Sequence, residues 1–209
     1  MLFGAAVSWA MQPAGVAAVL GEQPPEVLKA FAADRAAMRA NAPRPTLADA
    51  TAQLKQHLSV IAAQLQRGGP WLFGAAPSIA DFSVGHCLWF IRLARPVAHL
   101  LDAYAPIGPW LDRLLAIGHA TSTPMDSGEA LAVASGAATH AATGVDPGLG
   151  FEAGQAVTVA ATDYGVDPVA GTLVGLNGHE VVLRRSDARA GSVHVHFPRF
   201  GFQLRVDKT

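Results

Sequence analysis

The sequence has little of three things on which many protein functions depend: cysteine, charged residues and an excess of one charge sign. Only one of its 209 residues is a cysteine, Cys87, so no internal disulfide can form, which favours a reducing compartment and predicts a cytoplasmic location. Charged residues make up 15%, and 15 basic against 16 acidic residues leave a net charge of −1. Such a balance attracts neither nucleic acid nor an anionic membrane, so neither is expected as a partner.

Motifs of catalytic and metal-binding chemistry are also missing from the sequence. We find no phosphate-binding glycine loop between a strand and a helix, no nucleophile elbow and no Cys/His spacing typical of zinc. His86 and Cys87 are adjacent, and neighbours on a helix point about 100° apart, so we expect a packed thiol beside a core histidine. The sequence therefore predicts no catalytic residue, no metal and no resident cofactor in this chain.

What the sequence does have is apolar content, with 51% hydrophobic residues and a mean hydropathy of +0.28, which excludes a disordered chain. Residues 1–20 are especially apolar. They have no basic start, and Gln12 and Pro13 interrupt them, so we expect a helix rather than a signal peptide or a membrane span. Such an apolar helix must cover, or be covered by, another surface.

Residues 1–141 show the periodicity of helices separated by proline and glycine. An amphipathic helix is predicted over residues 46–68, where apolar residues recur three or four apart. A second is predicted over residues 79–93, preceded by Ser78, which with Asp81 has the spacing of a capping box. Because this second helix is apolar on nearly every side, we expect it at the centre of a helical bundle.

The period of the hydrophobic pattern changes in the last third of the chain. Residues 142–154 are rich in glycine and small side chains and are predicted to form a linker. Residues 155–209 alternate apolar and polar positions in five short runs, and Asn177-Gly178 is the strongest hairpin signal between them. The predicted fold class is therefore α+β: an all-α bundle over residues 1–141 and a small five-stranded SH3-like or OB-like β-barrel.

Two histidines of the predicted barrel are the only candidate metal ligands. His194 and His196 are two residues apart, so both lie on the same face of a strand, where such a pair can chelate a metal. The sequence identifies no third ligand. Histidines exposed to solvent on a strand are the favoured interpretation.

The run GAAPSIADF, residues 74–82, lies between an amphipathic helix and an apolar one and resembles the C-terminal helical domain of the cytosolic glutathione transferases. The resemblance extends over residues 1–135 and includes the aromatic pair Trp89-Phe90. It implies that Ser78 and Asp81 are structural capping residues rather than catalytic ones. The predicted barrel lies outside the resemblance.

In that family a thioredoxin-like domain binds glutathione and supplies the catalytic residue, and the helical domain forms the apolar wall of the second-substrate site. The resemblance therefore implies that Phe3, Val7 and Met11 on the first helix bind substrate, although ordinary core or interface packing is the alternative. No thioredoxin-like pattern of strands and helices occurs in the sequence. We therefore expect a domain that is inactive alone and uses glutathione only as the co-substrate of a separate domain.

Two main classes of function stay open. The first is a glutathione S-transferase-like protein whose partners are an apolar small molecule and either a second copy of the chain, as in a dimer, or a thioredoxin-like domain. The second is a non-enzymatic binding module whose C-terminal barrel recognises a peptide or a nucleic acid. A purely structural interaction protein is a third class.

Overall fold

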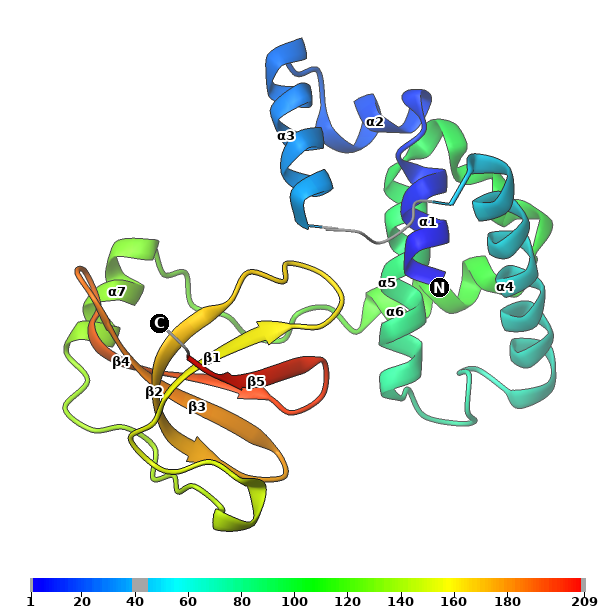
Figure 1. Ribbon diagram of the computed structural model, residues 1–209. Helices are drawn as coiled ribbons and strands as arrows, with labels where there is room; N and C mark the ends of the chain where they lie inside the picture. Colours follow the sequence, from blue (N-terminus) through cyan, green and yellow to red (C-terminus); the bar gives the residue numbers. More distant parts are fainter. Residues whose placement is uncertain (1, 39–44, 208–209) are drawn as a thin grey trace. The chain divides into compact units, whose positions relative to one another are not determined.

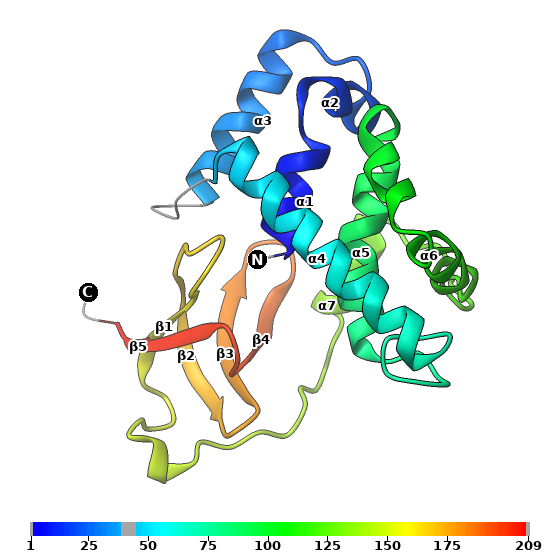
Figure 2. The same ribbon diagram turned by 90° about the vertical axis from the view of Figure 1, so that its right-hand side faces the viewer.

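The computed structural model describes residues 2–38 and 45–207 and confirms the α+β class, with helices followed by a five-stranded sheet (Figures 1 and 2). The helices are α1 (Leu2–Ala10), α2 (Pro13–Leu20), α3 (Pro25–Met38), α4 (Leu47–Gly68), α5 (Ile79–Leu93), η1 (Arg95–Ala103), α6 (Ile107–Ala116), α7 (Ser127–Ser135) and η2 (Pro147–Leu149). The strands are β1 (Ala156–Ala161), β2 (Val169–Leu176), β3 (Glu180–Asp187), β4 (Gly191–Pro198) and β5 (Phe202–Val206).

The chain divides into two compact units. The helical unit comprises Met1–Lys29 and Pro43–Ser122, and the sheet unit comprises Ala30–Ala42 and Thr123–Thr209. Helix α7 belongs to the sheet unit, where it packs on β4. The sequence predicts a helical domain over residues 1–141 and a barrel over residues 155–209, joined by a linker at 142–154. That these two parts fold independently stays a prediction.

The apolar first twenty residues form two helices rather than one. Pro13 is the first residue of α2, where its missing N–H costs nothing, and α1 and α2 are bent by 91° relative to each other. Ala5, Ala6 and Ala10 of α1 are buried, and their small side chains let α1 pack closely on α4 and α5. No single helix in the described parts of the chain is long and apolar enough to cross a membrane. Only α1 and α2 taken together have the length and apolar composition of a membrane span, and they are bent relative to each other.

Helix α4 is the amphipathic helix that the sequence predicts. The Thr46 Oγ1 caps it by accepting the backbone N–H of Asp49 at 3.1 Å. Leu54 and Leu58, on the apolar face of α4 that the periodicity predicts, are fully buried. Leu47 is predicted on the same face of the helix but is 47% exposed, so the buried part of this face begins one turn after the start of the helix.

Helices α5 and α6 approach each other closely at Gly85. A Cβ atom on Gly85 would overlap the Leu114 Cδ2, so this position on α5 has room only for glycine. Trp110 of α6 is fully buried beside it. The absence of one side chain thus allows a large ring to fill the core between these helices.

The sheet is antiparallel, with the strand order β4-β3-β2-β1-β5. Its edge strands β4 and β5 are joined by residues 199–201 alone. In a flat sheet the two edges would lie about 19 Å apart, whereas the four residue steps from Pro198 to Phe202 span at most about 14 Å. The sheet must therefore curl, and the rings of Phe197 and Phe202 meet across the closing edges with centroids 5.5 Å apart.

Inside this curl lies the apolar core of the sheet unit. Alternating apolar residues form most of it, as the sequence predicts, because every second side chain of a strand faces the same way. Its buried members come from β1, β2 and β3, and they are Val157, Val159, Leu173, Leu176, Val181 and Leu183. Val206, which the same pattern places on the apolar face, is instead 46% exposed.

We call residues 136–146 the strap, because part of this segment lies against the sheet. The Asp146 N–H donates to the Leu176 carbonyl at 2.8 Å, and the Leu176 N–H donates to the Gly144 carbonyl at 2.9 Å. Thr143 occupies the space at Gly175, where a Cβ atom would overlap its Oγ1. The composition of this segment, rich in small residues, predicts a linker. In the structure, its residues 143–146 pack on β2.

We expect a fragment of residues 123–209 to be more stable than one of residues 150–209. The longer fragment keeps α7 on β4 and the strap hydrogen bonds at Leu176. Loss of these bonds is expected to cost about 1–3 kcal/mol in the free energy of unfolding. Urea denaturation followed by circular dichroism measures the difference, and equal midpoints would contradict a stabilising strap.

Candidate functional site

Asp81 joins three segments of the helical unit through its buried carboxylate. Oδ1 accepts the N–H of Leu72 and the Nε1–H of Trp110, each at 2.9 Å. Oδ2 accepts the N–H and the hydroxyl of Ser78, also at 2.9 Å. The capping-box spacing predicts the bond from the Ser78 N–H, but nothing in it indicates Leu72 or Trp110. The carboxylate thus holds the loop before α5, the start of α5, and α6 together.

Asp81 is ionised, because hydrogen bonds outweigh the effect of burial on it. Burial alone raises the pKa of this carboxyl, but the donors from Leu72, Trp110 and Ser78 favour the charged form and bring the pKa below its ordinary value. With no exposed surface, the group is out of reach of a ligand. Its geometry supports a structural role.

The outward face of α5 carries a row of large side chains that we call the α5 stripe: Phe82, His86, Trp89 and Leu93. These positions are three or four residues apart, so they lie on one side of the helix. Its three apolar members are exposed by 45%, 42% and 42% in chain order. The helix lies among α1, α6 and η1, which pack on the side that includes Leu88, in agreement with the expected place in the bundle. Its apolar character on nearly every side does not mean burial on every side, because the stripe is uncovered.

Phe3, Val7 and Met11, predicted to bind substrate, continue this apolar surface onto α1. The Phe3 ring, 59% exposed, stacks on the His86 ring with centroids 5.9 Å apart. Val7 lies one turn further along α1 and is half-buried. Met11 follows the end of α1, but its N–H still donates to the Val7 carbonyl at 2.9 Å, which keeps it in the same row. Substrate binding by these three residues stays a prediction.

His86 and Cys87 do not form the buried pair that the sequence favours. Cys87 is 3% exposed, as expected, but His86 is exposed rather than in the core. The Cys87 Sγ lies 3.5 Å from the His86 Nε2, so the two side chains meet although they are adjacent on a helix. Burial raises the pKa of the Cys87 thiol, which keeps it protonated and poorly nucleophilic at neutral pH.

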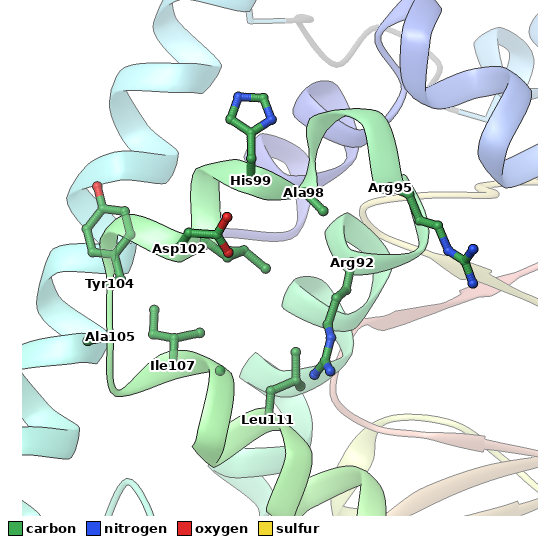
Figure 3. Close-up of a pocket in the computed structure, with 11 residues that line it drawn as sticks. Arg92, Arg95, Ala98, His99, Asp102, Tyr104, Ala105, Ile107 and Leu111 are labelled. Atoms are coloured by element: carbon green, nitrogen blue, oxygen red, sulfur yellow. The ribbon is translucent and has the colours of Figure 1, made fainter.

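A groove of about 580 Å³ lies between η1 and α6, with Arg92 of α5 in its lining but no residue of the α5 stripe (Figure 3). Ile107 and Leu111 form part of its apolar lining, and the Asp102 carboxylate points into it, whereas the Arg95 guanidinium points away. Arg92 on the other side is paired with Asp112 at 2.6 Å. Asp102 is exposed, so the groove has no buried charge that would fix a ligand.

On the sheet, His194 and His196 share one face of β4, but each has a different neighbour. The His196 Nδ1 lies 2.9 Å from the Glu180 Oε2 on β3. The His194 ring stacks on that of His140 in the strap, with centroids 3.9 Å apart and planes at 20°. Among residues 2–38 and 45–207, no group of three or more His, Cys, Asp or Glu side chains is placed to hold a metal ion.

Residues 30–113 match the family model of the glutathione S-transferase C-terminal domain, a range that contains α4, α5 and the pair Ser78 and Asp81. The chain contains a glutathione S-transferase C-terminal domain. A GST-like protein from Pseudomonas syringae, solved by crystallography, is 36% identical and aligns over 99% of this chain with a TM-score of 0.72. The chain spans 63% of the length of that protein. No curated protein matches the sequence significantly.

The likeness to the GST-like structure includes the sheet. Because 99% of the chain is aligned, strands β1 to β5 fall within the matched region. The sequence resemblance stopped near residue 135 and treated the strands as an addition to the glutathione transferase plan. The alignment with this one solved relative extends over the strands as well as the helices.

We expect Asp81→Asn to destabilise the glutathione transferase domain strongly. The amide has one acceptor oxygen in place of two, so buried donors at Leu72, Trp110 or Ser78 lose their partner. The expected loss is about 3 kcal/mol, since an unpartnered buried group costs about 1–3 kcal/mol and charged hydrogen bonds are the stronger ones. Urea denaturation followed by tryptophan fluorescence reports on this unit alone, because all four tryptophans lie in it.

The exposed Asp102 provides the matched control for that substitution. Asp102→Asn changes the same charge at a surface position, so its effect should stay within about 0.5 kcal/mol. A stability of Asp81→Asn equal to that of the wild type would contradict the structural role of this carboxylate.

The pKa of Asp81 also predicts how the helical unit responds to acid. Because the folded-state pKa is lowered, the stabilisation is complete above the unfolded value of about 3.9 and is lost as the pH falls through the folded value. We therefore expect the fluorescence-detected Tm to fall below about pH 4, and to fall less steeply in Asp81→Asn. Parallel pH profiles for the two proteins would assign the acid sensitivity to other carboxylates.

Proposed function

We propose that this chain forms the substrate-binding wall of a glutathione transferase-like enzyme. The α5 stripe together with Phe3, Val7 and Met11 holds an apolar electrophile. A thioredoxin-like unit outside residues 1–209 binds glutathione and lowers the pKa of its thiol. The reaction joins the glutathione sulfur to the electrophile, and the chain described here contributes orientation and an apolar surface.

The observation that carries this proposal is the exposure of the α5 stripe. Three large apolar side chains on one helix face, extended by the stacked ring of Phe3, are unusual on a surface that meets only water. Aromatic rings with a polar neighbour such as His86 suit a flat apolar ligand, which gains stacking as well as burial. The geometry supports a ligand or a partner domain here better than a purely solvated face.

The chemistry of the chain itself supports a wall rather than a complete active site. A glutathione thiolate needs a hydrogen-bond donor or a positive charge beside the sulfur. On the described α5 stripe, His86 is the one titratable side chain, and its ring is stacked on Phe3. Cys87 is buried with a raised pKa, so it offers no reactive thiolate of its own.

The same apolar surface supports association with a second protein surface. We expect the purified chain to form a dimer, or to bind the thioredoxin-like unit, in either case by covering part of the stripe. A cytoplasmic location agrees with a single thiol that needs no oxidising partner. Light scattering over a concentration series tests the dimer.

We expect the isolated 209-residue chain to bind an apolar dye but not glutathione. Calorimetry with glutathione should show no binding, and an assay with an aryl halide should show no conjugation above the uncatalysed rate. Anilinonaphthalene sulfonate should bind with a fluorescence increase, and Trp89→Ala should weaken it about tenfold, the equivalent of losing about 1.4 kcal/mol of aromatic contact. Phe3→Ala should have a similar but smaller effect.

Phe200→Ala is the matched control, because Phe200 is 94% exposed but lies on the turn between β4 and β5. This variant should leave the dye affinity unchanged. Equal dye affinities for Trp89→Ala and the wild type would contradict the proposal that the α5 stripe binds an apolar ligand. Saturable conjugation by the isolated chain would show that it carries its own thiol-activating group, and dye binding lost only in Phe200→Ala would favour a binding module built on the sheet.

A further inference from the structure

The strap touches the sheet at two places with different chemistry. Near its end, backbone hydrogen bonds with Leu176 hold Gly144 and Asp146 against β2. Near its start, the contact is a ring stack, His140 on His194, with centroids 3.9 Å apart. Helix α7, which precedes the strap, packs on β4, the strand that carries His194 (Figure 1).

Both of these contacts leave a buried polar atom without a hydrogen bond. In the described part of the chain, two buried side-chain nitrogen or oxygen atoms have no partner: the Thr143 Oγ1 and the His194 Nδ1. Thr143 is the strap residue over Gly175, and His194 is the sheet residue under His140. Native structures pair nearly all such atoms, so one unpaired atom at each of the two contacts indicates that the strap is held weakly.

The His194 ring tolerates this arrangement only while it is neutral. A neutral imidazole has one N–H, whereas the protonated ring has two, and the Nδ1–H of His194 would then face no acceptor. Burial is the largest cause of the lowered pKa of His194, followed by the positive charges of His140, His196 and Arg184. A proton on His194 therefore meets both desolvation and repulsion.

The charged groups on the elements packed around His194 do not supply the missing acceptor. Arg184 of β3 is its register partner across the strands, and a second cation opposes protonation. Glu180 of β3 is bound to His196, and Asp187 at the end of β3 accepts the N–H groups of Arg189 and Ala190. Arg185 of β3 is a further cation, paired in register with Val193. On α7 the one charged residue, Glu129, accepts the N–H of Asp126 in its capping box. β2 carries no charged residue.

We propose that residues 136–146 form a proton-controlled strap, which lies on the sheet while His194 is neutral and leaves it when His194 takes up a proton. The sign follows from linkage: the closed strap disfavours the proton, so its stability is complete above the ordinary histidine pKa of about 6.5 and declines as the pH falls below it. The equilibrium constant for opening should rise up to about tenfold for each pH unit in that range. Opening uncovers the face of β2 and β3 at Gly175 and Val182, where a Cβ on the glycine would meet both Thr143 and Val182.

The test is nuclear magnetic resonance of the full chain between pH 7.5 and 5. The His194 ring signal should titrate below pH 6.5, and the backbone N–H signals of Leu176 and Asp146 should follow the same curve. Hydrogen exchange of these two amides, corrected for its intrinsic pH dependence, should give an opening constant about tenfold larger at pH 5.5 than at pH 7.5. Amides that do not respond while His194 titrates, or a His194 that titrates at or above 6.5, would overturn the proposal.

His194→Phe keeps a ring under His140 but cannot take up a proton. The opening constant in this variant should be the same at pH 5.5 and pH 7.5. His140→Phe keeps the stack and removes the electrostatic effect of His140, so it should raise the pKa of His194 and reduce the pH dependence of opening. This variant provides the test if His194→Phe does not fold. His119→Gln, at an exposed position of the helical unit, should behave as wild type. An opening constant in His194→Phe that still rises about tenfold in acid would refute control by His194.

Discussion

The buried carboxylate of Asp81 is the constraint on which the arrangement of the helical unit depends. A charge inside a protein is tolerated only when enough donors surround it, and here four hydrogen bonds converge on two oxygen atoms. Trp110 supplies one of them from α6, so the position of that helix follows from the position of α5. Gly85 then lets the two helices approach closely enough for the Trp110 nitrogen to reach the carboxylate.

Fixing α5 in this way decides which of its faces is left uncovered. The helix is apolar nearly all round, so its composition alone does not orient it. With Asp81 turned toward Leu72 and Trp110, the residues of the stripe lie on a different side of α5 from the one that meets α6. An exposed aromatic surface is thus a consequence of the same network that stabilises the bundle, and the proposed ligand wall has a rigid support rather than a loop beneath it.

Local features of this molecule could be predicted from the sequence, and features that join distant residues could not. The spacing of Ser78 and Asp81, the helix over residues 46–68 and the five strands all follow from periods and turn residues that act over a few positions. The bond from Trp110 to Asp81 spans 29 residues, and no local pattern indicates it. Without it, the sequence could assign Asp81 a cap but not a place at the centre of the unit.

The strap shows a second limit of the same kind. Small residues predict a loop, but they do not say whether the loop packs on another element, because its partner here is a missing side chain at Gly175. The stack of His140 on His194 likewise joins residues 54 positions apart (194 − 140). The sequence could place His194 and His196 on one face of a strand, and the register of β4 with β3 agrees with this placement. It could not predict that the His140 ring covers His194.

The two units contrast in how they satisfy buried polar groups, and the contrast separates their responses to acid. Asp81 has a donor on every side, so its charge is stabilised until the pH falls below the ordinary range of a carboxyl, about 3.9. His194 has a buried nitrogen without a partner, so its contact weakens as soon as the pH falls below about 6.5. Between these two values the carboxylate network still holds the helical unit while the strap on the sheet loosens. The buried polar groups without partners therefore confine the proposed conformational change to the sheet unit. The change does not require any movement of the surface that we propose binds substrate.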